Sequence, residues 1–220
     1  MRKRTEGQIF WVVGAGKFGA KAVQALVSEN PRVQVVLVDS DPRKLKGWDE
    51  PVETVATDGV TYLVTGLKQG RKPDWIIPAI PLHVALELIG GLLPKEIQIE
   101  PIPIPAEIRQ KLPNPIIAAE GQLWVSHATF LCPANCSEPD EYCTVTRKPR
   151  NPDMYRLLEE LNTSVFNSVV VRSRQLAPGV GGYRPADIDR ALSEVRRSKG
   201  AMLVCTACRC HGVVNAIRTI

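Results

Sequence analysis

The sequence predicts an α/β fold: a doubly wound parallel sheet followed by a smaller, cysteine-rich α/β portion. Short apolar runs alternate with segments of helical period in the first half, which indicates parallel strands joined by crossover helices. Glycines with Gly-x-Gly-x-x-Gly spacing separate the first strand from the first helix. The six cysteines all lie in the second half. Together these three observations predict the fold class.

The first element is a buried strand at residues 9–13, and apolar residues at helical spacing from 18 to 26 predict the following helix. Gly14 allows a tight turn, Gly16 lets a pyrophosphate approach the backbone, and Gly19 lets the helix pack against the strand. The helix N-terminus offers free N–H groups and a partial positive charge to phosphates. The predicted cofactor-binding residues of this loop are Gly14, Ala15, Gly16, Lys17, Phe18 and Gly19.

The second strand, at residues 33–38, is followed by Asp39, which lies 20 residues after Gly19. An acidic residue at this distance binds the ribose hydroxyls of a dinucleotide, so Asp39 and the adjacent Ser40 are predicted cofactor-binding residues. Arg43 and Lys44 follow in a loop where bases could meet a 2′-phosphate, but Asp39 would repel that phosphate. The sequence therefore predicts NAD in preference to NADP. The alternative is a doubly wound domain that binds no nucleotide.

The remaining elements of the first half follow the same alternation. We expect strands at 53–56, 75–77 and 96–99 and helices at 60–70 and 83–93. Five prolines between residues 100 and 115 predict an extended connection with a short helix at 106–111. The expected division is a dinucleotide-binding domain at 1–105 and a cysteine-rich portion at 106–220.

Three segments of the first half, at 12–19, 36–42 and 56–59, carry a family resemblance. Here the chain resembles the nucleotide-binding domain of the TrkA type, which gates potassium transport, and the NAD(P)-binding Rossmann domain of saccharopine-dehydrogenase-type oxidoreductases. The resemblance implies that Asp58 lies near the adenine, although Thr57 stands where the TrkA type has glycine. It covers less than half of the chain and does not reach the cysteines.

The cysteines form two groups, Cys132, Cys136 and Cys143, and Cys205, Cys208 and Cys210 with His211 beside them. We expect a strand before each group, at 128–131 and at 201–204, and further strands at 116–119, 123–125 and 168–171 with helices at 152–161 and 184–199. If the two preceding strands are neighbours, the six thiols meet in one site that holds zinc or an iron–sulfur cluster. The alternatives are dithiol redox chemistry, a disulfide, or small buried hydrophobic side chains.

Other polar residues are weaker candidates. Candidate catalytic residues are His83, Cys205 and Cys208, although His83 is equally consistent with a histidine in a solvent-exposed loop. His127 is a candidate ligand or a simple hydrogen-bonding residue. Arginines 172, 174 and 209 form either an anion pocket or a solvated basic face. The glycine-rich segment 179–183 binds a phosphate or is a plain loop.

Composition limits the function classes. The net charge of +5 favours an anionic ligand or small molecule but is too small to indicate nucleic-acid binding. No segment has the length and apolar character of a membrane span, and we expect a cytoplasmic homo-oligomer with a protein partner.

Two functions from different classes remain open. The first is an NAD(P)-binding oxidoreductase component with a cysteine-ligated metal or iron–sulfur site. The second is a TrkA-like nucleotide-sensing module, without catalysis, whose cysteines hold a structural metal.

Overall fold

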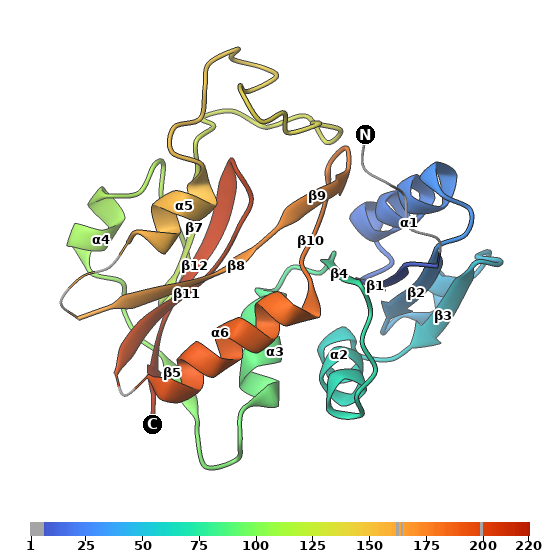
Figure 1. The fold of residues 1–220 in the computed structure, drawn as a ribbon, viewed down its shortest axis with the longest axis horizontal. Coiled ribbons are helices and arrows are strands. Elements are labelled where there is room, and N and C mark those ends of the chain that lie inside the picture. The colour runs from blue at the N-terminus through green and yellow to red at the C-terminus, as the bar shows by residue number, and fades with distance from the viewer. Residues whose placement is uncertain (1–6, 162, 164, 199) are drawn as a thin grey trace.

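The computed structural model describes residues 7–161, 163, 165–198 and 200–220 (Figure 1). Its first half contains a parallel four-stranded sheet with the order β3-β2-β1-β4. The strands are β1 (Ile9–Val13), β2 (Gln34–Asp39), β3 (Val52–Ala56) and β4 (Trp75–Pro78). The helices are α1 (Lys17–Glu29), α2 (Gly59–Lys68) and α3 (Val84–Leu92), with a 3-10 turn η1 at Pro42–Leu45. The predicted α/β class with a Rossmann-like parallel sheet is confirmed in this half.

The second half is built on a mixed sheet with the order β6-β7-β12-β11-β8, in which β5 also pairs with β12. The strands are β5 (Ile99–Pro101), β6 (Ile116–Ala119), β7 (Gln122–Ser126), β8 (Asn167–Arg172), β11 (Ala201–Ala207) and β12 (His211–Thr219). In this sheet β8 and β11 are parallel neighbours, and the other described pairs are antiparallel.

Three expectations about individual strands are wrong. The strand expected at 96–99 does not extend the first sheet, because β5 instead pairs antiparallel with the end of β12. Residues 128–131 form no strand and begin a long irregular segment that continues to residue 153. The last strand does not end at residue 204, since β11 continues to Ala207 and is followed by β12, a strand that was not expected.

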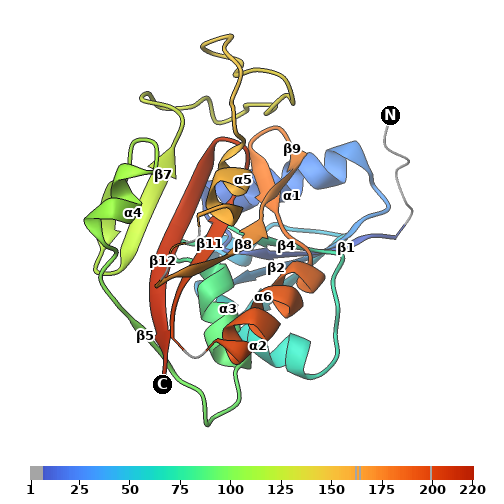
Figure 2. The same cartoon turned by 60° about the vertical axis from the view of Figure 1, so that its left-hand side comes forward.

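Helices and a hairpin connect the two halves. Figures 1 and 2 show α3 and α6 (Pro185–Arg197) between the second sheet and the first half, with α4 (Ala106–Gln110) and α5 (Met154–Glu159) on the other side of that sheet. The hairpin of β9 (Arg174–Ala177) and β10 (Val180–Gly182) packs against α1. One hydrophobic core contains Trp11 and Ile76 from the first half and Val204 and Ile217 from the second. The two halves therefore share an interior.

The end of the hairpin adds a further link. Tyr183, which follows β10, forms an antiparallel bridge with Ile76 of β4, with N–H···O distances of 2.9 and 3.0 Å. This bridge brings β9 and β10 beside the carboxyl ends of β1 and β4, where ligands bind in doubly wound sheets. None of the helices in the described ranges is long and apolar enough to cross a membrane.

Candidate functional site

The three glycines of the loop after β1 meet different surroundings. Gly14 has a φ of +99°, and a Cβ atom there would lie 2.6 Å from the carbonyl oxygen of Ala79. A Cβ atom on Gly19 would lie 1.7 Å from the carbonyl oxygen of Gly14, so packing alone requires both glycines. A Cβ atom on Gly16 would meet no atom of the described residues within 4 Å. Packing does not explain a glycine at position 16, whereas a ligand close to the backbone would.

Position 16 is also the N-cap of α1, and no side chain in the described part of the chain caps this helix end. The next two residues, Lys17 and Phe18, are exposed, and Ala15 is buried. The first-turn N–H groups are the usual binding site for a phosphate at a helix N-terminus.

Asp39 is held against this loop. Its Oδ2 atom accepts the Ala15 N–H at 2.7 Å, and its Oδ1 atom accepts the Asp41 N–H at 2.8 Å. Lys44 Nζ lies 3.7 Å from Oδ2. An ionised carboxylate has about four lone-pair sites, so these contacts leave room for the hydroxyls of a ribose.

The other base of the loop after β2 is already paired. The guanidinium of Arg43 contacts both carboxylate oxygens of Asp41 at 2.9 Å. The hydrogen bonds from Arg43 lower the pKa of Asp41 to about 2. The Arg43 guanidinium is therefore already paired with a carboxylate and would have to leave Asp41 to bind the 2′-phosphate of NADP.

The remaining predicted nucleotide residues lie at the same edge of the sheet. Ser40 is exposed directly after β2. Asp58 caps α2, since its Oδ1 atom accepts the Thr61 N–H at 2.8 Å, and this bond lowers the pKa of Asp58. Gly59 allows α2 to approach β1, because a Cβ atom there would lie 2.1 Å from Val13 Cγ1.

Five of the six cysteines line one pocket of about 250 Å³. They are Cys132, Cys136, Cys143, Cys208 and Cys210, joined by His211, Glu138 and Phe18. The structure does not bring Cys205 to them. Cys205 is fully buried within β11, packs in the core beneath α5, and its Sγ atom lies 3.8 Å from Ser168 Oγ.

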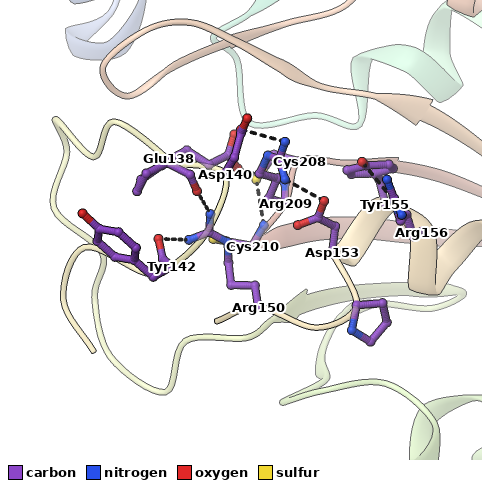
Figure 3. A network of polar contacts seen from close by, with 12 residues as sticks. Glu138, Asp140, Tyr142, Arg150, Asp153, Tyr155, Arg156, Cys208, Arg209 and Cys210 are labelled. Atoms are coloured by element: carbon purple, nitrogen blue, oxygen red, sulfur yellow. Dashed lines mark hydrogen bonds and ion pairs between the residues drawn. The ribbon is translucent and has the colours of Figure 1, made fainter. Parts of the chain in front are cut away.

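Backbone N–H groups point at three of these sulfurs, and Figure 3 shows the turn that carries Cys208 and Cys210. Cys208 Sγ accepts the N–H groups of Cys210 and His211, both at 3.4 Å. Cys136 Sγ accepts the Glu138 N–H at 3.4 Å. Backbone hydrogen bonds from Thr146 and Val145 lower the pKa of Cys143. Such bonds stabilise a thiolate more than a thiol.

Burial acts in the opposite direction on the deeper thiols. Burial raises the pKa of Cys208, and it raises the pKa of Cys210 to about 12. When no cation is bound, both side chains are therefore neutral thiols. His211 lies between two sulfurs, with Nε2 3.4 Å from Cys132 Sγ and Nδ1 3.8 Å from Cys208 Sγ. Burial lowers the pKa of His211, which favours the neutral imidazole that binds metals.

The donors of the pocket are soft thiolates and an imidazole, the set that suits zinc or iron. Among the residues that the structure describes, no three cysteine, histidine or acidic side chains lie together at the spacing of metal ligands. Metal binding would therefore require the side chains of the pocket to turn toward a common centre.

The cysteine segment is tied to the nucleotide helix and to the hairpin. Lys21 of α1 donates to the carbonyl oxygen of Ala134. The Gly179 N–H donates to the carbonyl oxygen of Cys136 at 3.0 Å. Phe18, on the first turn of α1, is 62% exposed and forms part of the pocket wall. The cysteine pocket and the glycine loop therefore adjoin each other.

Ion pairs hold the other end of the cysteine segment (Figure 3). The Arg209 guanidinium lies 2.8 Å from the Asp153 carboxylate and 2.7 Å from the Asp140 carboxylate. The backbone N–H of Arg209 donates to the Glu138 carboxylate at 2.9 Å. The Arg150 guanidinium donates to the carbonyl oxygens of Tyr142, at 2.8 Å, and of Pro139. No sequence pattern indicated a role for Asp153, because it lies far from Arg209 along the chain.

The other candidate residues have protein partners. Arg172 stacks on Tyr155, with its guanidinium carbon 3.9 Å from the ring centroid, and Arg174 contacts Asp187 at 2.5 Å. The segment 179–183 is the turn and second strand of the hairpin, and its Gly179 packs against Ala134. His127 is partly buried, and its Nε2 atom lies 3.0 Å from the carbonyl oxygen of Pro152.

His83 is not in a solvent-exposed loop. It is buried at the start of α3, where its Nδ1 atom lies 2.8 Å from Asn215 Oδ1 and its Nε2 atom lies 2.8 Å from Thr206 Oγ1. These bonds join α3 to β11 and β12. Burial lowers the pKa of His83 to about 4.

Comparison with known proteins covers most of the chain. A protein of Archaeoglobus fulgidus is 30% identical over 225 aligned positions, which cover 94% of this chain and 98% of the relative. A family model, AF_1314_C, described as "Uncharacterized protein, C-terminal domain", matches residues 74–220. The matched part runs from the start of β4 to the C-terminus and contains His83 and all six cysteines. The chain belongs to the AF_1314_C family.

Proposed function

We propose that the protein is an NAD(H)-binding oxidoreductase component whose nucleotide site adjoins a cysteine-ligated metal or iron–sulfur centre. The observation that carries the proposal is the shared wall between the two sites. Phe18 lines the cysteine pocket and lies two residues after Gly16, where the pyrophosphate would bind. Lys21 of the same helix contacts the cysteine segment at Ala134.

The nucleotide half of the proposal rests on the loop after β1. The open space at Gly16, the uncapped start of α1 and the orientation of Asp39 together fit a dinucleotide. Pairing of Arg43 with Asp41 leaves Lys44 as the base nearest to a 2′-phosphate, and Lys44 is drawn toward Asp39. These contacts support NAD in preference to NADP.

The metal half rests on the chemistry of the pocket. Cys136, Cys143 and Cys208 are the strongest ligand candidates, because backbone N–H groups already offset negative charge on their sulfurs. Cys132, Cys210 and His211 lie in the same pocket, and one of them would supply the fourth ligand of a four-coordinate site. A bound cation would also allow the buried thiols of Cys208 and Cys210 to deprotonate.

Each part of the chain then has a defined task. The loop at 14–19 and Asp39 bind and orient the dinucleotide, and Phe18 of this loop lines the neighbouring cysteine pocket. The metal centre, when bound, supplies electron transfer if it is iron–sulfur or Lewis acidity if it is zinc. His83 is neutral and holds Thr206 in place, so it acts as a positioning residue.

Two measurements on the full chain test this function. Protein purified under anaerobic conditions without chelator should contain zinc or iron, and an iron–sulfur form would be brown. Calorimetric titration should give tighter binding of NADH than of NADPH. Protein that contains metal but binds neither nucleotide would contradict the nucleotide half, and protein that binds NADH but never contains metal would contradict the metal half.

The direct contact between Lys21 and Ala134 also favours the second candidate, a nucleotide-sensing module with a structural metal. A nucleotide that moves α1 would move the cysteine segment through this contact. In that case NADH would change the rate at which Cys132 and Cys143 react with a maleimide but would not be oxidised. Oxidation of NADH with transfer of electrons to the bound centre would exclude this second function.

A further inference from the structure

A second cavity, of about 370 Å³, lies on the sheet of the second half, at the ends of β6, β7, β11 and β12. Its volume is in the range of sites that bind small organic molecules. Three of its lining residues, Ser173, Cys208 and His211, also line the cysteine pocket. The two cavities are therefore neighbours that share one wall.

Most of this cavity is apolar. Ile116 and Trp124 form part of its lining although they are 60% and 54% exposed, and Val213 lies between them and the polar end. In register, Ile116 and Val213 flank Trp124 on the two neighbouring strands, so the three side chains share one face of the sheet. A half-exposed indole between two branched side chains gives a flat apolar surface suited to a ring.

The polar end of the cavity contains Thr206, whose hydroxyl has a fixed role. His83 Nδ1 faces the side-chain oxygen of Asn215, which also accepts a hydrogen bond from the Gln122 amide. Because this oxygen can only accept, Nδ1 carries the imidazole proton and Nε2 is an acceptor. The Thr206 hydroxyl therefore donates to His83 Nε2 at 2.8 Å. Its oxygen keeps lone pairs for a second partner, and a ligand that meets this oxygen must be a donor.

The same bond connects the cavity to the nucleotide half. His83 ends the segment that follows β4, and β1 and β4 are the strands between which the order of the first sheet reverses. In doubly wound sheets the reacting end of a dinucleotide lies beyond this switch point. Thr206 is thus one hydrogen bond away from the segment where the nicotinamide would lie.

We propose that this cavity binds the organic substrate of the proposed oxidoreductase, a ring-sized apolar alcohol that lies on Trp124 and donates its hydroxyl to Thr206 Oγ1. The inference rests on the proposed function for the role of the ligand but not for its binding. Polar residues that can donate or accept hydrogen bonds at one end and apolar side chains at the other are typical of such pockets.

Benzyl alcohol is a suitable probe, and the indole N–H resonance of Trp124 in ¹⁵N-labelled full-length protein reports its binding. We expect a saturable shift of this resonance at millimolar probe. Val213→Trp fills the space and should weaken binding at least about tenfold. Trp124→Ala removes the apolar surface and should weaken binding by a similar factor. Because this second variant also lacks the reporter, its binding is measured by saturation-transfer NMR on the signals of benzyl alcohol. Leu131→Ala, at a residue that is 97% exposed and outside the cavity, is the matched control and should bind as the wild type does.

The hydroxyl contact has its own test. Thr206→Val should weaken benzyl alcohol binding by about threefold to tenfold, the range of one hydrogen bond, while Thr206→Ser should restore it. Toluene has no hydroxyl, so its binding should be the same in both variants. Equal binding of benzyl alcohol to both variants would overturn the assignment of Thr206.

Other outcomes separate this inference from the proposed function. NADH should bind to Trp124→Ala as it does to the wild type. If benzyl alcohol binds at Trp124 but NADH does not bind at all, the proposed function fails and the cavity assignment stands. If the Trp124 resonance responds to protein concentration and not to benzyl alcohol, a second copy covers this face and the inference is wrong.

Discussion

His83 Nε2 and Thr206 Oγ1 lie 2.8 Å apart, and the hydrogen bond between them joins the start of α3 to the sheet of the second half. The imidazole is buried, and burial lowers its pKa from 6.5 to about 4. At pH 7 the ring is neutral, with its proton on Nδ1 facing Asn215. The link between the two halves therefore depends on an uncharged histidine.

This pKa predicts acid sensitivity. Between pH 6.5 and 4 the unfolded chain binds a proton at His83 that the folded chain does not bind, so the free energy of unfolding falls as the pH falls through this window. A depression of this size corresponds to about 3 kcal/mol, fully present above pH 6.5. Urea unfolding at pH 7, 6, 5 and 4 measures this loss of stability.

His83→Gln should flatten this pH dependence, and it should cost more stability at pH 7 than at pH 5. His127→Gln is the control, because His127 is only partly buried and should leave most of the slope intact. An unchanged slope in His83→Gln would show that other groups cause the acid sensitivity.

Gly16→Val should separate nucleotide binding from folding. No atom of the described residues lies within 4 Å of a Cβ atom at position 16, so the melting temperature should stay close to that of the wild type. The branched side chain would occupy the space of a pyrophosphate, so NADH binding measured by calorimetry should be abolished.

Gly200→Val is the matched control for this experiment. A Cβ atom on Gly200 would likewise meet no atom of the described residues within 4 Å, and Gly200 lies far along the chain from the loop after β1. This variant should keep both stability and NADH binding. Retention of NADH binding by Gly16→Val would argue against a dinucleotide at this loop.

Arg209 offers a contrast between a partly buried ion pair and an exposed one. Its partner Asp153 is 10% exposed, whereas its partner Asp140 is 83% exposed. Asp153→Asn should destabilise the protein by about 1–3 kcal/mol, and Asp140→Asn by less than about 0.5 kcal/mol, since exposed pairs are screened by water. Equal losses in chemical denaturation would contradict this interpretation of the two pairs.

The first sheet could be predicted because its signals are local. Each strand is a short apolar run, and the glycine spacing and Asp39 fix the turns around β1 and β2. The second sheet depends on pairings between distant segments, such as β12 with β5 and β7, which no local pattern shows. The strand β12 was missed for this reason.

The cysteine pocket was predictable only in part. Both groups do meet, but Cys205 lies inside β11, where neighbouring side chains point to opposite faces. Thr206 consequently faces α3 and the second cavity, while Cys205 faces α5 and the core. A strand that ended at residue 204, as expected, would have placed Cys205 in a loop with Cys208.

This geometry changes what the cysteine variants should do. Cys136→Ser and Cys208→Ser should each lower the metal content and the melting temperature together, because both sulfurs lie in the pocket and a bound metal ties two distant segments to each other. Cys205→Ala should leave the metal content unchanged and lower stability only through the small cavity it creates in the core. Elemental analysis and thermal unfolding of the same samples, prepared without chelator, measure both quantities.

Wild-type protein that is free of metal, with six titratable thiols and the same stability after Cys136→Ser, would leave dithiol redox chemistry as the better account of the pocket. Cys205, which lies outside the pocket, would then take no part in that chemistry.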